Sequence, residues 1–296
     1  MTENKHLSII VASYRSERTI EACLMSLERQ QVEFDYEIIV VHSSDDSTPE
    51  LIKEKFPQVI LFSFKERKSI GEARNFAITK ACGEIIAIID ADCTVDSTWA
   101  ANVVKAHELK YLAIGGAVAN GNPYSYVGWG QYFCEFSAWM PCKDSKMMSN
   151  IPAASISYKH EVFKKCGLFV EDTYCEDTEF HWRLSSSGHY LFFTPLIVVY
   201  HHNRENLADF LKHMFMLGMA FARFRLTKWR YPLITRSVYS AFSPLIPVRL
   251  LLRIVFINCT NRIYFPHFVK ALPLLFLGLI SWSLGELISY ITGSRH

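Results

Sequence analysis

Apolar runs rich in β-branched residues alternate with helical patterns along the first 120 residues of this 296-residue chain. The apolar runs cover residues 7–11, 37–41, 59–64, 84–89 and 113–119. The intervals expected to be helical are 17–30, 49–55, 70–81 and 97–109. Runs that are largely apolar predict strands buried on both faces, and their alternation with helices predicts a parallel sheet in an α/β fold.

The mixed pattern continues to about residue 205. Residues 120–150 are rich in glycine, proline and aromatic side chains, and we expect them to be irregular. They would form either a substrate-facing loop or packed core. The elements expected after them are a segment at 151–158, helices at 160–166 and 176–187, and short strands at 190–193 and 196–200.

Polar clusters stand at the carboxyl ends of three predicted strands. They are Ser13 with Tyr14, the run 42–47, and Asp90 with Asp92. Ligands of parallel α/β sheets bind beyond the carboxyl ends of the strands, where these clusters would converge. The order of the elements therefore predicts one functional crevice before any single motif is considered.

Formal charge is unevenly divided along the chain. Residues 201–296 hold 12 Lys and Arg against 3 Asp and Glu, a net charge of +9, whereas residues 1–200 carry −7. An acidic part followed by a basic, apolar part predicts a soluble-type domain with a membrane-associated region attached. We expect domains at 1–205 and 206–296, and membrane lipids rather than nucleic acid as partners of the second.

The region 206–296 is expected to be all-helical. A helix of about 206–226, capped by Asn206, is strongly apolar and ends in a basic aromatic cluster suited to lipid headgroups. An ordinary core helix is the alternative. Prolines and arginines interrupt 238–257, which we expect to be a broken or interfacial helix. The 22 residues 271–292 carry one charge, Glu286, and are expected to cross the membrane, with in-plane burial as the alternative.

Asp90 and Asp92 are the sharpest local feature, because they directly follow a buried strand. Two carboxylates at i and i+2 present oxygens to one hard cation, and Mg²⁺ or Mn²⁺ is commonly held by carboxylates together with substrate phosphates. Acidic turns are common, so the position at the sheet edge carries the argument. His201 and His202 follow another strand; either imidazole would complete the metal shell, and we choose His202.

Two helix starts carry further candidate groups. Gly71 permits a close backbone approach, and Arg74, one turn inside the same helix, can reach a phosphate or a nucleotide carbonyl. A solvated arginine is the alternative. Glu176 and Asp177 begin a helix whose dipole stabilises carboxylates, and this acidic site would supply a general base for an acceptor hydroxyl.

Cysteine spacing and the N-terminus bear on the compartment. The eight cysteines show no C-x-x-C pair and no accompanying histidine pattern, which argues against a zinc site or a disulfide framework. The N-terminus is polar, and its first apolar run is too short for a signal sequence. We therefore expect the first part of the chain to be cytosolic.

Four segments, in order, resemble glycosyltransferase family 2, the inverting enzymes with an A-type fold that use nucleotide-activated sugars. The segments are IIVASYRSERTIEACLMSL, EIIVVHSSDDST, GEARNFAITKACGEIIAIIDAD and VFKKCGLFVEDTYCEDTEFHWRLSSSGH, within residues 6–205. The resemblance implies an A-type glycosyltransferase fold, Rossmann-like with a mixed, mostly parallel sheet flanked by helices. The membrane-associated tail would follow it.

The resemblance also implies roles for single residues. Asp92, with Asp90, would handle metal and nucleotide, and Asp177 would be the catalytic base. The nucleotide-sugar pocket would be lined by Ala12, Tyr14, His42, Asp45, Arg74, Asp90 and Glu176. The implied reaction moves a sugar, with inversion, from a nucleotide-diphosphate donor to an acceptor hydroxyl with Mg²⁺ or Mn²⁺. We place it at the cytosolic membrane face, with a lipid-linked or other membrane-proximal acceptor.

Two positions depart from the family pattern. The family usually has Asp at the position of His42, where it contacts the base, so the base and the donor stay open. Processive relatives carry a Q-x-x-R-W motif, which is not cleanly present in 213–230. Its absence disfavours synthesis of a long polymer.

Other classes of protein remain as rivals. A nucleotidyltransferase would share the α/β fold and the acidic metal site, but it usually has a glycine-rich loop where residues 12–16 contain no glycine. A non-catalytic membrane scaffold of the same fold would bind neither nucleotide sugar nor metal. A dinucleotide dehydrogenase is disfavoured because no G-x-G-x-x-G follows Val11.

Overall fold

The computed structural model describes residues 5–142, 144–171 and 173–293. These form two compact units, each described below by itself. The first unit is Met1–Gly121 with Pro141–His201, and the second is Asn122–Met140 with His202–His296. The expected domains, 1–205 and 206–296, differ from these units mainly at residues 122–140, which group with the C-terminal helices.

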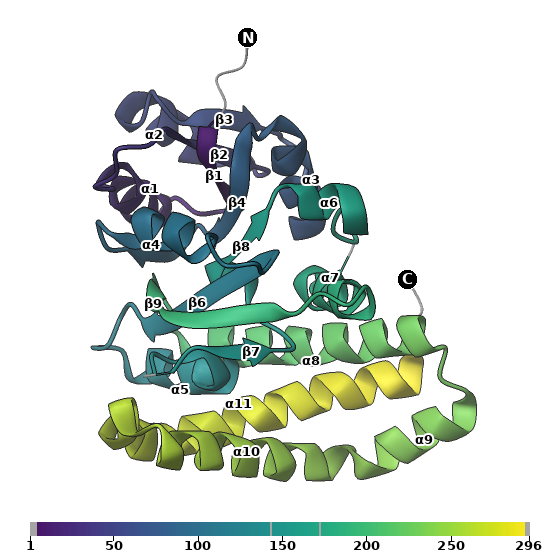
Figure 1. The fold of residues 1–296 in the computed structure, drawn as a ribbon. Coiled ribbons are helices and arrows are strands. Elements are labelled where there is room, and N and C mark those ends of the chain that lie inside the picture. Colours follow the sequence, from purple (N-terminus) through teal and green to yellow (C-terminus); the bar gives the residue numbers. More distant parts are fainter. Residues whose placement is uncertain (1–4, 143, 172, 294–296) are drawn as a thin grey trace. The chain divides into compact units, whose positions relative to one another are not determined.

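A mixed sheet forms the centre of the first unit (Figure 1). Its strands are β1 (Lys5–Ser13), β2 (Tyr36–His42), β3 (Ile60–Ser63), β4 (Gly83–Asp90), β5 (Cys93–Val95), β6 (Ala113–Asn120), β7 (Lys146–Met148), β8 (Ile156–Lys159) and β9 (Leu191–His201). The order is β3-β2-β1-β4-β8-β6-β9-β5, and β7 pairs with β9. Neighbours β3, β2, β1 and β4 are parallel, as are β6 and β9, whereas β8 runs antiparallel to β4 and β6.

Helices of the first unit follow the strands in the predicted alternation. They are α1 (Ile20–Glu28), α2 (Thr48–Lys55), α3 (Ile70–Lys80), α4 (Trp99–Ala106), α6 (Glu161–Cys166) and α7 (Glu176–Ser186). The apolar stripe of α1, with Ile20, Cys23, Leu24 and Leu27, is buried against the core that β1, β2 and β4 supply. The expected α/β fold with a mixed, mostly parallel sheet flanked by helices is confirmed.

Two local expectations are wrong. Residues 190–193 and 196–200 form one strand, β9, which continues through Pro195 by a shift in its register with β6 between Gly116 and Ala117. A bulge accommodates a residue without an N–H, so the proline does not end the strand. Residues 120–150 are not irregular throughout, because α5 (Tyr126–Phe136) forms there with Ser125 as its N-cap.

The second unit is helical. With α5 and the short turn η1 (Ser137–Trp139), it contains α8 (Leu207–Trp229), α9 (Leu233–Phe242), η3 (Ser243–Leu245), α10 (Ile246–Thr260), η4 (Arg262–Tyr264) and α11 (Phe265–Thr292). The Asn206 side chain accepts hydrogen bonds from the backbone N–H groups of Ala208 and Asp209, at 2.8 and 3.1 Å, which confirms the predicted cap. The predicted break within 238–257 is the 3-10 turn at Ser243 and Pro244.

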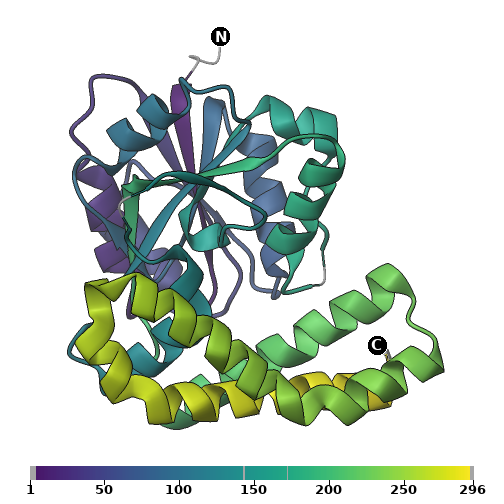
Figure 2. The same ribbon diagram turned by 60° about the horizontal axis from the view of Figure 1, so that its bottom comes forward.

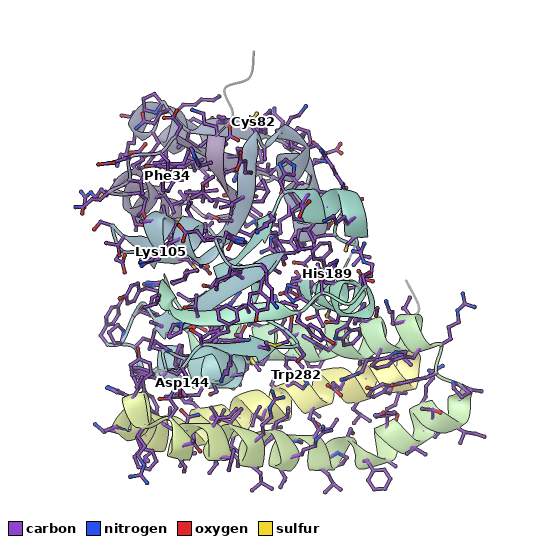
Figure 3. All side chains as sticks on the ribbon, in the orientation of Figure 1. Phe34, Cys82, Lys105, Asp144, His189 and Trp282 are labelled. Atoms are coloured by element: carbon purple, nitrogen blue, oxygen red, sulfur yellow. The ribbon has the colours of Figure 1, made fainter. Side chains whose placement is uncertain are left out.

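Three long stretches of helix lie side by side in this unit. α11 lies between α8 and the arm formed by α9, η3 and α10 (Figures 1 and 2), and its Trp282 is labelled in Figure 3. Leu233–Thr260 and Arg262–Thr292, with mean hydropathies of 1.7 and 1.8, are long and apolar enough to cross a membrane by length and composition. They differ in burial, since 17% of the first window and 44% of the second is buried within the protein.

Candidate active site

Strand register brings the predicted polar clusters to one edge of the sheet. In β1, Ala12 lies opposite Val41 of β2 and opposite Asp90 of β4, and Ser13 lies opposite His42. The three strands are parallel, so their carboxyl ends meet at the same edge. The prediction that these clusters converge is confirmed by the register.

Arg74 joins two of the acids. Its side chain is buried on α3; Nη1 donates to Glu176 Oε1, and Nη2 donates to Asp90 Oδ1 at 2.7 Å. The helix start that positions it is well defined, because Ser69 and Glu72 form a capping box. Gly71 is required there, since a Cβ atom at this position would collide with the Val170 carbonyl oxygen.

Burial and charge act against each other in this group. Burial raises the pKa of Glu176 to about 7 and also raises the pKa of Asp90, although the Arg74 guanidinium favours the ionised form of both. Burial disfavours the charged form of Arg74, but the two carboxylates outweigh this effect and raise its pKa. The three side chains thus form a coupled, charged bridge between the start of α7 and the end of β4.

Asp177 stands beside this bridge as the second residue of α7. Its Oδ1 accepts from the Thr178 N–H at 2.6 Å, and its Oδ2 accepts from the Ala153 N–H at 3.2 Å. Burial raises the pKa of Asp177 even though Arg74 and these two N–H groups favour its carboxylate form. The side chain is half-buried. A fixed, partly accessible carboxylate with a raised pKa suits a general base.

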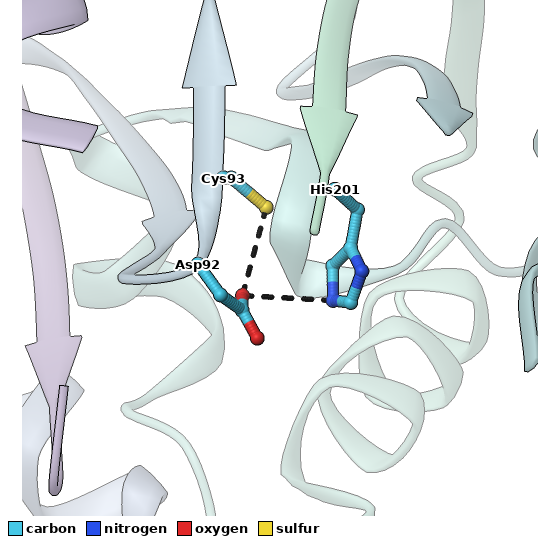
Figure 4. Close-up of side chains that lie close together, drawn as sticks. All are labelled: Asp92, Cys93 and His201. Carbon is cyan, nitrogen blue, oxygen red and sulfur yellow. Dashed lines mark hydrogen bonds and ion pairs between the residues drawn. The ribbon is translucent and has the colours of Figure 1, made fainter. Parts of the chain in front are cut away.

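A second cluster of polar side chains lies between the end of β4 and the end of β9, beside the start of β5 (Figure 4). Asp92 Oδ1 is 3.5 Å from His201 Nε2 and 3.9 Å from Cys93 Sγ, and the three side chains offer ligand atoms within 4.8 Å of one another. His201 reaches this place because it pairs with Cys93 in the antiparallel β5–β9 ladder.

The donor set fits a divalent cation. Burial, followed by the nearby Asp92 charge, raises the pKa of the Cys93 thiol, so the sulfur stays protonated and is a poor ligand. A carboxylate and an imidazole remain, and both are common metal ligands. Asp90 keeps one oxygen on Arg74 and is 31% exposed, so it also presents surface at this edge.

His202 does not lie with His201 in this cluster. It belongs to the second unit, where its Nε2 lies 3.4 Å from Glu205 Oε1. β9 ends at His201, whose pairing with Cys93 places its ring beside Asp92, whereas His202 follows the strand. The sequence does not reveal which of the two histidines lies there, because the choice depends on the register of β9 with the three-residue strand β5.

The His42 ring is fully buried at the end of β2. Its Nε2 lies 3.1 Å from the Ser44 carbonyl oxygen and 3.4 Å from Asp46 Oδ1, and its Nδ1 lies 3.0 Å from Ser13 Oγ. A carbonyl oxygen only accepts, so we assign the proton to Nε2 and let the Ser13 hydroxyl donate to Nδ1. In this arrangement His42 holds the loop after β2, and its predicted contact with the nucleotide stays a prediction.

Other predicted pocket residues lie at the open edge. Tyr14 is 40% exposed, Asp45 is exposed and Ala12 is half-buried. The Arg67 guanidinium lies 4.8 Å from the centroid of the Tyr14 ring, and its Nη2 donates to the Tyr174 hydroxyl at 3.1 Å. Arg67 belongs to none of the predicted site motifs, and its signal in the sequence is the basic run of Lys65, Arg67 and Lys68 before α3.

The chain matches one protein family and several individual proteins. The model of the family described as "Glycosyl transferase family 2" matches residues 8–163, which is more than half of the chain. Glycosyltransferase AglE of Haloferax volcanii is 24% identical over 230 residues, covering 72% of this chain and 71% of that protein. The glucosyl-dolichyl phosphate glucuronosyltransferase of the same organism is 23% identical over 185 residues, 56% of each chain.

A solved structure shares the fold. The mannosyltransferase PcManGT from Pyrobaculum calidifontis, in complex with GDP-Man and Mn²⁺, superimposes with a TM-score of 0.62 at 19% sequence identity. The superposition covers 97% of this chain and 88% of that one. This likeness confirms the architecture expected for both parts of the chain.

Proposed function

The chain belongs to glycosyltransferase family 2 and is a nucleotide-sugar glycosyltransferase with an A-type fold, and we propose that it transfers its sugar with inversion to a membrane-proximal acceptor. The observation that carries this proposal is Asp177, held by two backbone N–H groups beside the bridge of Glu176, Arg74 and Asp90. It supplies a positioned base at the sheet edge where the donor is expected.

The reaction is a single displacement. Asp177 takes the proton of the acceptor hydroxyl as that oxygen forms a bond to the anomeric carbon of the donor. The bond between the anomeric carbon and the diphosphate oxygen breaks, and its electron pair leaves with the nucleoside diphosphate. Attack opposite the leaving group inverts the anomeric carbon. Arg74 acts as a positioning residue, since it fixes Glu176, the neighbour of Asp177, to the end of β4.

We assign a divalent cation, Mg²⁺ or Mn²⁺, to Asp92 and His201, with Asp90 beside them and with His202 as the alternative ligand. The support is the donor set described above and the Mn²⁺ in the PcManGT complex. When bound, such a cation neutralises charge on a diphosphate. The residues of the chain do the rest: they bind the donor, orient it and accept the proton.

The nucleotide is expected at the edge that Ala12, Tyr14 and Asp45 frame. Tyr14 offers an exposed ring backed by Arg67, which suits stacking on a base and attraction of a phosphate. His42 acts through the loop it holds. GDP-Man is the donor in the PcManGT complex, and it is one candidate here.

The acceptor is proposed to be lipid-linked and to be met at the cytosolic membrane face. Two observations support this: the +9 charge of residues 201–296 with the two long apolar segments, and the relative named for its action on glucosyl-dolichyl phosphate. A membrane-attached unit would keep the active site close to a substrate that cannot leave the bilayer.

The test is a panel of nucleotide sugars with Mg²⁺ or Mn²⁺, scored for donor hydrolysis and for transfer to lipid extracts. We expect one donor to be turned over, with inverted product. Asp177→Asn should fold and still bind donor, yet lose at least about 1,000-fold in kcat, because removing a general base and its charge is costly. The exposed Asp144→Asn is the matched control. Undiminished transfer by Asp177→Asn removes Asp177 from the role of base, and failure of the whole panel favours a scaffold.

A further inference from the structure

In the second unit, α8 and α11 approach each other to backbone contact. A Cβ atom at Gly218 of α8 would collide with the Trp282 carbonyl oxygen of α11, and one at Gly285 of α11 would collide with the Phe215 carbonyl oxygen of α8. Two glycines facing backbone in this way leave no room between the helices. Each helix contributes one glycine that faces the backbone of the other helix, so α8 and α11 stay in close contact over both positions.

Hydrogen bonds also link α8 and α11 at two positions along their length. Ser281 Oγ donates to the Leu211 carbonyl oxygen at 2.7 Å, and Ser289 Oγ donates to the Met219 carbonyl oxygen at 3.1 Å. The numbers rise together, so α8 and α11 run parallel. Whatever orientation α11 takes toward a membrane, α8 must share it.

α8 is largely apolar, but its charged residues are incompatible with a membrane crossing shared with α11. Exposed Lys212 directly follows Leu211, which pairs with Ser281 at the middle of 271–292. Farther along, Arg225 binds Glu286 at 2.6 Å. A crossing of α11 would therefore carry exposed Lys212 to the centre of the hydrocarbon, where a charge is strongly unfavourable.

The arm formed by α9, η3 and α10 turns a narrow face inward. Its buried residues recur at helical spacing, namely Ser243, Pro247, Ile254 and Asn258. Ser283 Oγ of α11 donates to the Ser243 carbonyl oxygen at 2.5 Å, and Arg236 Nε donates to the Tyr290 carbonyl oxygen at 3.0 Å. The arm thus runs antiparallel to α11, with one buried stripe facing inward and exposed side chains on the opposite face.

The opposite face of the arm is apolar and flanked by cations. Leu245, Leu252 and Phe256 are 59%, 65% and 73% exposed, and we call them the outer stripe. Arg249 and Arg253 are also exposed and lie beside it on the helical wheel, well inside the segment 233–260. The sequence places ten Lys and Arg and no Asp or Glu between Asp209 and Glu286. An apolar stripe edged by unbalanced positive charge complements an anionic lipid surface.

We propose that the second unit is a monotopic platform, in which the arm lies in the plane of an anionic bilayer surface and no helix crosses. The outer stripe is buried at the headgroup–acyl boundary, and Arg249 and Arg253 contact the anionic headgroups. This inference rests on the proposed membrane attachment, and it differs from the crossing that the sequence predicts for 271–292. It gives the +9 charge a direct function.

Topology is tested by labelling in reconstituted vesicles. Leu233→Cys and Thr260→Cys, each in a Cys259→Ser background, place thiols at exposed positions at the two ends of the arm. Glu54→Cys, exposed on α2, reports the fraction of first units that face outward. A membrane-impermeant maleimide, read by mass spectrometry of each peptide, should label all three positions to the same fraction. Labelling of 233 and 260 in complementary fractions means that the arm crosses, and it overturns the proposal.

Lipid contact is tested by flotation with vesicles of phosphatidylglycerol and phosphatidylcholine. Arg249→Gln with Arg253→Gln should weaken binding about 25-fold, taking about fivefold for each cation near an anionic surface. Lys53→Gln with Lys105→Gln, exposed in the first unit, makes the same charge change and should leave binding unchanged. Phe256→Ser should weaken binding to every vesicle composition.

Two other results overturn the platform. Full-length protein that turns over donor but does not float with anionic vesicles shows that something other than lipid covers the outer stripe, such as a protein partner. Equal weakening by the control pair shows that net charge alone, rather than this face, drives the binding. Donor hydrolysis in the same samples reports the first unit, so loss of the glycosyltransferase activity itself is seen separately.

Discussion

Arg74 is the residue on which the arrangement of the acids depends. One guanidinium joins Glu176 at the start of α7 to Asp90 at the end of β4, and it is almost completely buried. Removing Arg74 would leave two carboxylates in a poorly solvated place without the cation that they share. The sequence predicts Arg74 as a ligand-contacting cation, whereas the structure shows it engaged by protein carboxylates. A helix pattern reveals the residue but not its distant partners.

Measurements of metal binding should distinguish the roles of the adjacent residues His201 and His202. His201→Ala should weaken Mn²⁺ binding at least about tenfold, because it removes an imidazole that lies beside Asp92. His202→Ala is the matched control, since that ring lies by Glu205. Calorimetric titration of Mn²⁺ into the protein with a nucleoside diphosphate measures both. Weakened binding in His202→Ala alone would return the metal to the residue that the sequence favours.

Buried His181 makes stability depend on pH. Its Nε2 lies 2.7 Å from the Tyr158 hydroxyl and its Nδ1 lies 2.5 Å from Asn150 Oδ1, and burial lowers its pKa to about 3. Below about pH 6.5 the unfolded chain takes up a proton that the native ring refuses until about pH 3. The free energy of unfolding should therefore fall as the pH drops through this window.

Replacing His181 measures its contribution to the pH dependence of the free energy of unfolding. Between pH 7 and pH 5 the histidine should cost about 2 kcal/mol, taking about 1.4 kcal/mol per pH unit below the unfolded pKa. In urea unfolding, His181→Gln should show a loss between these pH values that is smaller by this amount, whatever its stability at pH 7. His6→Gln, at an exposed ring, is the control. An unchanged pH dependence in His181→Gln would mean that the ring is protonated in the native state.

Among the elements, those with a strong pattern are the ones the sequence predicts. The middles of β1, β2 and β4 are largely apolar because both of their faces are buried, and this leaves a clear signal. β5 has three residues directly after Asp92 and reads as loop. It decides the site nevertheless, because its register with β9 places His201 rather than His202 beside Asp92. Short strands depend on partners that only the folded sheet supplies.

The contact between α8 and α11 should be sensitive to one methyl group. Gly218→Ala places a Cβ atom against the Trp282 carbonyl oxygen, so the helices must separate. Overpacking of this kind costs about 1–3 kcal/mol, and we expect faster proteolysis within the second unit at unchanged donor hydrolysis by the first. Met216→Ala, at a 40% exposed position of the same helix, is the control. Identical proteolysis of both variants would contradict the backbone contact.

At the scale of the whole molecule, the division of charge has two separate causes. Acids of the first part include the proposed base and metal ligands, Asp177 and Asp92, which the motifs reveal directly. Cations of the second part have no motif, and length and hydropathy alone favour a crossing for 271–292. What the sequence cannot show is that α11 is bound along its length to α8 with its exposed Lys212, because that depends on tertiary contacts of Gly218 and Gly285.

Salt should therefore separate the two parts of the activity. Contacts between exposed arginines and anionic headgroups are screened strongly at 1 M salt, where the Debye length is about 3 Å. Transfer to an acceptor carried in phosphatidylglycerol vesicles should fall steeply between 0.1 and 1 M NaCl. Donor hydrolysis should change little, because the bridge of Arg74, Glu176 and Asp90 is buried or partly buried and less screened. The comparison uses one preparation and two assays. Parallel loss of both would show that salt acts on the catalytic unit, whereas salt-independent transfer would mean that apolar contact alone holds the protein on its membrane.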